Sequence, residues 1–499
     1  MSSVISRTMY PVTASMSLIN TMKTQFASLQ QQLATGDKAS NLAELGDDRA
    51  FDLSLRARQT RLDGYSSSIT MLNTRLDMAD QVTTRLGDIQ SSSRSLIMPS
   101  TYGSDDIVLG AVPTQAKTSL DETINLLNTD VAGRYLFGGS VTDKAPVASM
   151  SDILDGSAGK AGFKQVANER LAADYGDGHG RVTVGGTGDT ATLTEDAGPF
   201  GFKLSTLTSN SIATNLTSPT GTSPQSLAVQ FTGQPQANDS ITIGLTLPDG
   251  TTDGITLTAV TGTPAAGQFQ IGTDAASTAA NFKAALGTAL QGKADTSLTA
   301  ASNNEAANNF FNASGQPIQR VPGPDFAHAT SLVNADPTTT VQWYMGGDSS
   351  DPRSSIQARV DDAITVNYGA QANESGTLNL VRSLAVLSIQ NFDSSDPNVE
   401  GKFDGIASRN IDRLSASHNS DPGSIQRLTI ELNNAQVQVG DVKTRQTDYS
   451  AQLQGMLSNI ETVPNEQVAA SILALQTQLQ ATYQTTSLMA QLSLVNYIK

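Results

Sequence analysis

The sequence predicts a mixed α and β fold, in which long terminal α-helices form a coiled-coil-like rod and the middle of the chain forms a β-rich insertion domain. Two observations support this fold class. Near both ends, apolar residues recur at spacings of three and four, which is the period of an amphipathic helix. Between about residues 145 and 340, the composition changes to Gly, Thr, Ser, Asp and Ala with short alternating runs and frequent turn signals, which is typical of strands.

The clearest helical pattern lies near the C-terminus. Eleven positions form a seam with strictly alternating spacings, which predicts a rod of roughly 54 Å at ~1.5 Å per residue. Pro464 ends this helix, and a second helix follows with its own apolar stripe. The seam is Ile425, Leu428, Leu432, Ala435, Val439, Val442, Gln446, Tyr449, Leu453, Met456 and Ile460, and the stripe is Val468, Ile472, Leu475, Leu479, Tyr483, Leu488, Leu492 and Val495.

The N-terminal part has a similar organisation of three predicted helices. The first breaks at Thr35-Gly36, and the second starts at Asp47-Asp48, whose carboxylates suit a helix N-terminus. A third spans about Asp106 to Val131, with Pro113 marking a kink or a later start. The first two stripes are Val12, Ile19, Met22, Phe26, Leu29 and Leu33, and then Tyr65, Ile69, Leu72, Leu76, Ala79, Leu86 and Ile97, interrupted at Thr83, Gln90 and Ser93.

The middle region is predicted to be mostly strand. Its sharpest unit is a hairpin formed by residues 241–247 and 255–260 around Pro248–Gly254. The other predicted elements are an Ala-rich helix at 278–290, a loop or short helix at 300–315, strands at 341–345 and 363–368, and a helix at 375–390.

Charge is almost absent from both extremities. Residues 1–34 carry only Arg7 and Lys23, and residues 465–499 carry only Glu466 and Lys499, whereas residues 37–63 hold eleven charged side chains. Burying unpaired charge is costly, but a hydrogen-bonded amide or hydroxyl is tolerated in a packed interface. We therefore expect both ends to be covered by other copies of the chain and to fold on association. The alternative is an uncharged, disordered tail.

The overall composition argues against several classes of protein. A net charge of −16 over 499 residues disfavours nucleic acid as a partner. Without cysteine, the chain has no disulfide, thiolate metal ligand or thiol nucleophile. Residues 1–10 lack the apolar run of a cleavable secretory signal, and no stretch reaches the ~18 apolar residues of a membrane span. We expect no membrane insertion and an export route that reads no such signal.

No residue pattern indicates a catalytic, cofactor-binding or metal site, so none is predicted. The chain is predicted not to be an enzyme. A hydrolase using carboxylates of the middle region is the enzymatic alternative. The residues that could take part in chemistry are isolated from one another. The histidines His179, His328 and His418 lack metal-ligand spacing, and the run Asp174–His179 is predicted to be a turn. The pair Asp361-Asp362 stands alone, Gly138-Gly139 is predicted to be a tight hairpin turn, and Trp343 is predicted to be a core or anchor residue.

Two groups of residues carry a family resemblance. The run Leu29–Gly36 (Leu-Gln-Gln-Gln-Leu-Ala-Thr-Gly), the pair Asp47-Asp48 and the heptads that follow resemble the flagellin superfamily, over roughly residues 1–145 and 340–499. Within it, Gly133–Ser140 (Gly-Arg-Tyr-Leu-Phe-Gly-Gly-Ser), with Thr142-Asp143 and Pro146, and the ending Leu492–Ile498 look like the hook-filament junction proteins.

The resemblance implies several expectations about function. They are export in an unfolded state through the flagellar type III channel, with an export chaperone, and a secreted, extracellular location at the hook-filament junction. The chain would self-associate into a ring or tube and contact neighbouring hook-associated protein and flagellin subunits. Its length and Arg49, where a proline often follows the acidic pair, keep flagellin itself as an alternative. An outward-facing adhesin on a helical stalk is another.

These expectations divide the chain into three parts. Residues 1–44 and 455–499 form terminal helices packed in the assembly. Residues 45–144 and 341–454 form a helical rod domain with a small strand region. Residues 145–340 form one or more variable β-rich outer domains.

Overall fold

The computed structural model describes the backbone of residues 5–98 and 109–497, and the side chains of residues 13–98 and 109–491. The chain separates into two compact units. Unit 1 consists of Met1–Met71, Arg359–Ile364 and Gln438–Lys499, and unit 2 consists of Leu72–Ala358 and Thr365–Val437. The border falls within two long helices, α2 (Arg49–Ile97) and α10 (Ile425–Glu461), which contribute residues to both units.

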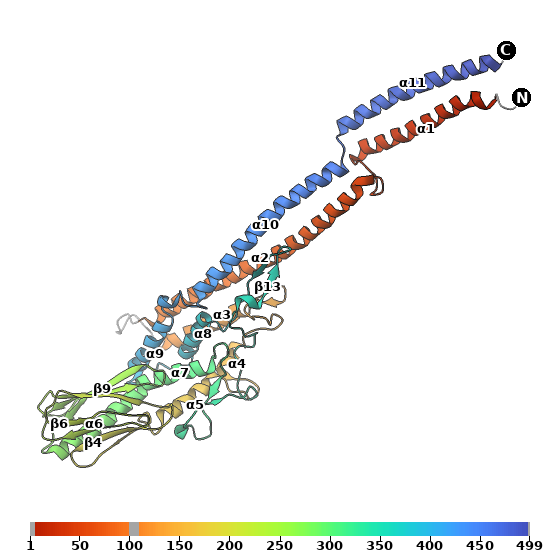
Figure 1. The fold of residues 1–499 in the computed structure, drawn as a ribbon. Coiled ribbons are helices and arrows are strands. Elements are labelled where there is room, and N and C mark those ends of the chain that lie inside the picture. Colours follow the sequence, from red (N-terminus) through yellow and green to blue (C-terminus); the bar gives the residue numbers. More distant parts are fainter. Residues whose placement is uncertain (1–4, 99–108, 498–499) are drawn as a thin grey trace. The chain divides into compact units, whose positions relative to one another are not determined.

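Unit 1 is built mainly from helices. The first helix, α1 (Ile5–Thr35), packs along the last one, α11 (Asn465–Tyr497) (Figure 1). After the short 3₁₀ helix η1 (Gly46–Asp48), α2 and α10 pack through four buried apolar side chains, Leu55, Leu62, Leu453 and Ile460. These helices confirm the predicted long terminal helices and rod.

Main-chain hydrogen bonds tie the connection after α1 to the connection before α11. Asp37 forms an isolated antiparallel bridge with Thr462. The N–H of Lys38 donates to the carbonyl of Glu461 at 2.6 Å, and the N–H of Val463 donates to the carbonyl of Gly36 at 3.0 Å. These bonds hold the two connections side by side. The helix α10 ends at Glu461, before Pro464, as predicted.

The predicted seam of α10 is buried at nine of its eleven positions, which confirms the heptad assignment. Gln446 is only 7% exposed, and its Nε2 donates to the carbonyl of Val360 at 2.5 Å. The two exceptions are Tyr449 and Met456, which are 39% and 41% exposed. In α2, the polar interruptions Thr83 and Ser93 are buried within the same face as the apolar residues.

Unit 2 combines helices with two sheets. Pro113 lies in the first turn of α3, so the later of the two predicted starts is correct; residues 106–108 lie outside the described part of the chain. The helices are α3 (Val112–Leu127), α4 (Met150–Asp155), α5 (Phe163–Tyr175), α6 (Ala275–Lys293), α7 (Thr299–Phe310), α8 (Ser375–Ser388) and α9 (Val399–Arg413), with short turns η2 (Leu109–Ala111), η3 (Ala294–Leu298), η4 (Phe326–His328), η5 (Arg353–Ser355) and η6 (Ala416–His418).

Two four-stranded sheets confirm the predicted β-rich insertion (Figure 1). The first is antiparallel with order β3-β4-β7-β6, and the second has order β10-β9-β8-β5, in which only β10 is parallel to its neighbour. Their strands are β3 (Val182–Gly185), β4 (Thr190–Glu195), β5 (Lys203–Ser209), β6 (Thr214–Thr217), β7 (Ser226–Phe231), β8 (Ser240–Thr246), β9 (Thr252–Val260) and β10 (Gln268–Gln270). The predicted hairpin is β8 and β9.

Short two-stranded pairs complete unit 2. They are β1 (Asp130–Val131) with β2 (Arg134–Tyr135), β11 (Gln319–Arg320) with β12 (Val333–Asn334), and β13 (Gln357–Arg359) with β14 (Thr365–Asn367). The strand predicted at 363–368 is thus found as β14. The helices predicted at 278–290 and 375–390 are α6 and α8, and α7 is the short-helix alternative at 300–315.

The core of the insertion lies between its sheets and α6. Three rings meet edge to face: Phe269 and Phe282 have centroids 5.3 Å apart, and Phe231 lies 5.7 Å from Phe282. All three are at most 1% exposed. An Asp274–Ser277 capping box starts α6 and satisfies N–H groups that the helix leaves unpaired.

Two predictions about the middle of the chain are wrong. Residues 341–345 form no strand; Tyr344 makes only an isolated bridge with Val147, while Trp343 is fully buried as a core residue. The region is also not mostly strand, because α4, α5, α6 and α7 occupy a share comparable to its strands. Charged residues on the inner face of α5 disguise its helical period, since Glu169, Arg170 and Asp174 are buried there in ion pairs.

Candidate assembly surface

The helices α1 and α11 bury one narrow seam against each other. Ile19 and Met22 of α1 are 8% and 3% exposed, and Val468, Ile472 and Leu475 of α11 are 3% to 9% exposed. The Oγ1 of Thr482 also lies 3.8 Å from the Sδ of Met22. Their spacing of three and four places these residues on one face of each helix, so part of each predicted stripe forms the contact between the two ends of the chain. Leu33, Tyr483 and Leu488 of the predicted stripes are exposed instead.

The remaining faces of unit 1 leave apolar side chains in water. Of the nineteen large hydrophobic side chains that are exposed in the described part of the chain, thirteen belong to unit 1. The largest exposed fractions in the helix pair are 60% for Met16, 64% for Leu473 and 58% for Leu488. Exposed apolar side chains that are repeated along one pair of helices can be covered by another molecule. These side chains therefore mark α1 and α11 as the candidate assembly surface.

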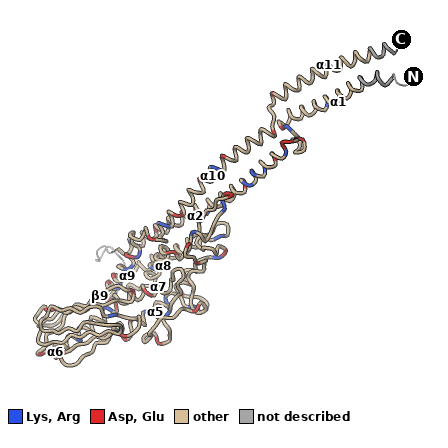
Figure 2. Tube along the Cα trace, viewed as in Figure 1, with Lys and Arg blue, Asp and Glu red and all other residues tan. Residues whose placement is uncertain are grey.

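The same helices are nearly free of charge. Among the described side chains of α1 and α11, only Lys23 and Glu466 are charged, whereas charged side chains recur along α2 and α10 (Figure 2). A helix exposed to water usually carries charges on its outer face, since these favour solubility. A surface without them brings identical copies together at little electrostatic cost.

Several hydroxyl groups on these helices already have hydrogen-bond partners within their own helix. Each of these donates to the carbonyl four residues earlier, so it needs no acceptor from a neighbouring molecule. Such a hydroxyl is buried at less cost than an unpaired one. The bonds are Thr21 to Ser17 (3.0 Å), Thr24 to Asn20 (3.0 Å), Ser471 to Gln467 (2.9 Å), Thr477 to Leu473 (2.9 Å) and Thr482 to Gln478 (2.7 Å).

Charged residues start directly after α1. Lys38 Nζ lies 3.1 Å from Asp48 Oδ2, and Arg56 pairs with both Asp52 and Glu461. Burial and the adjacent Asp52 raise the pKa of Glu461, while Arg56 acts in the opposite direction. The predicted boundary between an uncharged end and a charged segment therefore coincides with the end of α1.

The motif Gly133–Ser140 packs against Gly347, Ala370 and Gln371 in unit 2, and we call this contact the clasp. Gly138 pairs with Gln371 and accepts a hydrogen bond from the N–H of Gly347 at 2.8 Å, while the N–H of Gly139 donates to the carbonyl of Ala370 at 2.9 Å. A Cβ on Gly139 would lie 2.4 Å from the carbonyl oxygen of Gly347, and φ there is 56°. Only glycine suits this position, so the motif specifies a packing contact.

A turn is present at Gly138-Gly139, since the N–H of Val141 donates to the carbonyl of Gly138 at 3.1 Å, but it is not the predicted hairpin turn. The hairpin of β1 and β2 lies earlier in the chain. It turns at Ala132 and Gly133, which have φ values of 54° and 73°.

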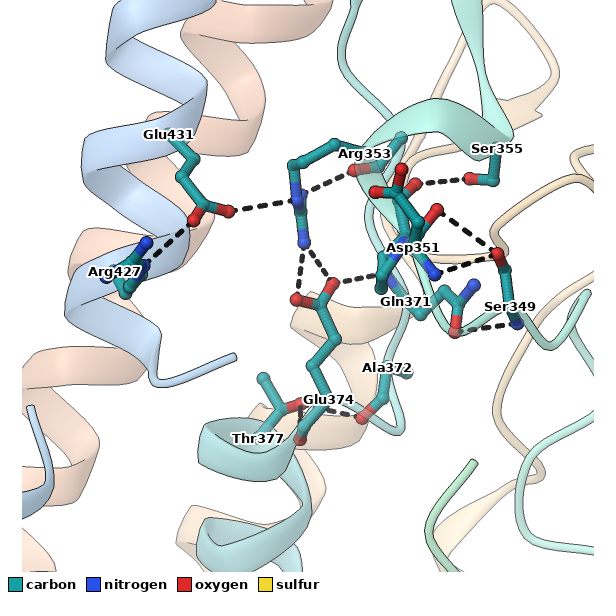
Figure 3. A network of polar contacts seen from close by, with 12 residues as sticks. Ser349, Asp351, Arg353, Ser355, Gln371, Ala372, Glu374, Thr377, Arg427 and Glu431 are labelled. Carbon is teal, nitrogen blue, oxygen red and sulfur yellow. Dashed lines mark hydrogen bonds and ion pairs between the residues drawn. The ribbon is translucent and has the colours of Figure 1, made fainter. Parts of the chain in front are cut away.

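A buried ion-pair network next to the clasp fixes α10 to α8 (Figure 3). Arg353 contacts both carboxylate oxygens of Glu374, and its Nε lies 3.3 Å from Glu431 Oε2. Arg427 pairs with the other oxygen of Glu431 at 3.0 Å, and the N–H of Gln371 donates to Glu374 at 2.9 Å. Burial raises the pKa of Glu374, and Arg353 opposes that shift. The network positions helices; its centre, Arg353 with Glu374, is largely buried, whereas Arg427 lies at its exposed edge.

The structure does not bring the other candidate residues together. His328 pairs with Asp325 at 3.0 Å and His418 with Asp421 at 2.9 Å, both locally. Asp174 is buried against Arg170 and the N–H of Gly201, so the run Asp174–His179 is a structural turn. The indole of Trp343 donates to Asn312 at 3.0 Å. Within residues 5–98 and 109–497, no cluster of three potential metal ligands occurs.

The comparisons with known proteins give one finding. Residues 7–142 match the family of the bacterial flagellin N-terminal helical region. No curated protein matches the chain. The matched family is structural and not enzymatic, which confirms the prediction that the chain is not an enzyme. In the described part of the chain, no helix has a segment of the length and apolarity needed to span a lipid bilayer.

Proposed function

We propose that this chain is a structural subunit of the flagellum that forms the junction between hook and filament, like hook-associated protein 3. The match of residues 7–142 to the bacterial flagellin N-terminal helical region supports a place in the flagellum. In this role α1 and α11 pack against the same helices of neighbouring copies to form a ring or tube. The observation that carries the proposal is the exposed, almost uncharged apolar surface of these two helices.

The energetics favour association over an isolated helix pair. Burying a fully exposed Leu or Met side chain contributes about 1.5–3 kcal/mol, and each copy exposes several of them on α1 and α11. Several such contacts per copy offset the loss of translational freedom on association. The hydroxyls add little cost because they are bonded within their own helices.

The proposal also assigns roles to the other parts. Residues 1–44 and 455–499 form the inner assembly, residues 45–144 and 341–454 form the rod, and residues 145–340 face outward. The subunit is exported unfolded, with a chaperone that covers the terminal helices before assembly, and it acts outside the cell. Its neighbours at either end are a hook-associated protein and flagellin.

The position along the flagellum tests this assignment. Antibody raised against the insertion should label a single band at the far end of the hook in electron micrographs of intact flagella. Labelling along the whole filament would instead identify the chain as flagellin, the alternative that the family match itself favours. Absence from the flagellum would reject both.

An adhesin is the second alternative, and the exposed Ile212, at 93%, shows that the insertion also presents apolar surface. Deletion of residues 150–335 separates the two roles. Lost attachment with intact motility would support adhesion, whereas lost motility supports a structural role.

A further inference from the structure

A cleft of about 490 Å³ opens on unit 1 between α2, the loop at Asp361-Asp362 and α10. We call it the rod cleft. Its walls carry three guanidinium groups and two carboxylates, so it has a net positive charge. The residues that matter below are Arg58, Arg61, Tyr65, Asp362, Arg445 and Gln446.

The guanidinium groups have more donors than partners. Each arginine side chain has five N–H donors. Arg58 donates to the hydroxyl of Tyr449 at 3.1 Å, and Arg61 reaches Asp362 only at 3.3 Å. Arg445 is exposed and forms no side-chain bond with any residue that the structure describes. The rod cleft therefore presents free donors of the geometry that binds carboxylates.

Of the two carboxylates in the cleft, Asp362 is held by neighbouring donors. The hydroxyl of Tyr65 donates to Asp362 at 2.8 Å, and this bond, with Arg61, lowers the pKa of Asp362. Asp362 therefore stays ionised. Its partners are Tyr65 and Arg61, so Arg445 can pair with a carboxylate from another molecule.

Gln446 gives an independent indication that the cleft is incomplete. The residue is 7% exposed and its Nε2 is bonded to Val360, but its Oε1 has no partner in the described structure. A buried carbonyl oxygen without a donor is costly and is rare in folded proteins. Since this oxygen has almost no accessible surface, the free donors that a second molecule can reach are the guanidinium groups, and a carboxylate would pair with them.

We propose that the rod cleft receives the connection between α1 and α2, residues 36–48, of a second copy of this chain. This connection has four acidic side chains and one lysine. Lys38 pairs with Asp48, and Glu44 accepts from Ser40 at 2.8 Å, which leaves the carboxylates of Asp37 and Asp47 exposed. Its negative charge complements the cleft, and its backbone supplies N–H donors.

The contact must join two molecules. Along α2, Arg49 directly follows the connection, and the cleft residues Arg58 and Tyr65 lie nine and sixteen positions further on, about 14 Å and 24 Å along the helix axis. A connection cannot reach the cleft of its own chain. The inference rests on the proposed self-assembly and adds to it the charged contact that sets neighbouring copies in register.

A charge swap tests the proposal in cells that lack the native gene. Both Arg445→Glu and Asp47→Arg should lower the amount of subunit in purified flagella about tenfold, since each places like charges together. The double variant should recover most of the loss. Lys443→Glu, an exposed substitution on α10 outside the cleft, is the matched control and should assemble normally. Unchanged melting of each purified monomer shows that folding is intact.

Disulfide trapping provides the second measurement, because the chain has no cysteine of its own. Flagella containing Asp47→Cys together with Arg445→Cys should give a ladder of cross-linked subunits after oxidation, while either single variant should not. Normal assembly without a ladder, or a double charge variant no better than the single ones, would overturn the contact.

The outcomes separate this inference from the proposed function. If the unaltered protein is absent from flagella, the proposed function fails. If Arg445→Glu blocks secretion but the purified variant assembles as well as the unaltered protein, the cleft binds an export partner and the second-copy contact is wrong.

Discussion

The insertion and the terminal helices use similar apolar residues in opposite ways. Phe269 and Phe282 of the insertion are 1% exposed, whereas Met16 and Leu473 of the terminal pair are 60% and 64% exposed. The insertion encloses its own core between sheets and α6. The terminal pair buries one seam and leaves its other faces open. The difference indicates that one region is stable within a single chain, while the other is completed by neighbouring molecules.

The largest expected effect is the loss of assembly on removal of residues 465–499. The truncated protein should lose assembly entirely, because α1 then has no intramolecular partner. Its insertion should keep a cooperative melting transition. Normal incorporation of the truncated chain into flagella would contradict the assignment of α11 to the assembly.

A matched pair of substitutions tests the same contrast at single residues. Phe282→Ala should lower the free energy of unfolding of the insertion by about 3–5 kcal/mol, since it leaves a cavity in a packed core. Leu473→Ala should change monomer stability by less than about 0.5 kcal/mol but weaken assembly. Denaturant titration of both monomers checks the first effect, and sedimentation of assembled material checks the second.

Leu432→Pro tests the rod between these regions. Leu432 is buried on α10, and proline there removes a helix hydrogen bond and clashes with the preceding turn. We expect a loss of roughly 3 kcal/mol or more in unfolding free energy. Leu432→Met is the conservative control, and a melting curve unchanged by proline would refute the seam.

The last predicted effect depends on pH and is confined to unit 2. Burial opposes ionisation of Asp249, but its hydrogen bonds from Arg409 and Thr251 prevail and lower its pKa below 3.8. Its contribution to stability is therefore complete above pH 3.8 and is lost as the pH falls through the folded pKa. Asp249→Asn should cost about 1–2 kcal/mol at neutral pH.

That difference should shrink progressively below pH 3.8 when the two proteins are unfolded by denaturant across a pH series. A gap that persists at pH values below the folded pKa would assign the loss to packing instead. The terminal pair, with only Lys23 and Glu466 charged among its described side chains, offers little comparable titration.

Strong local periodicity made much of the fold predictable. The seam of α10, the stripes of α1 and α11 and the hairpin of β8 and β9 follow from spacing alone. The candidate assembly surface was predictable too, since it depends on where charge stops along the chain. The side chains of residues 5–12 and 492–497, which include Val12, Leu492 and Val495, lie outside the described side chains.

Elements shaped by tertiary packing were not predictable. In α9, Gly401 and Gly405 suggest a broken helix, yet a Cβ on Gly405 would lie 2.9 Å from the Cβ of Ala300. The glycine allows a close helix contact that only the folded chain reveals. At residues 341–345, Val341 and Trp343 are buried, whereas Met345 is 50% exposed. No continuous partner strand lies beside them, so alternation did not produce a strand.

The self-bonded hydroxyls of α1 and α11 have a mechanical consequence. Since these hydroxyls already have their acceptors one turn back in their own helices, they need not donate to a neighbouring molecule at that surface. They therefore oppose lengthwise slip of adjoining helices less than unpaired donors would.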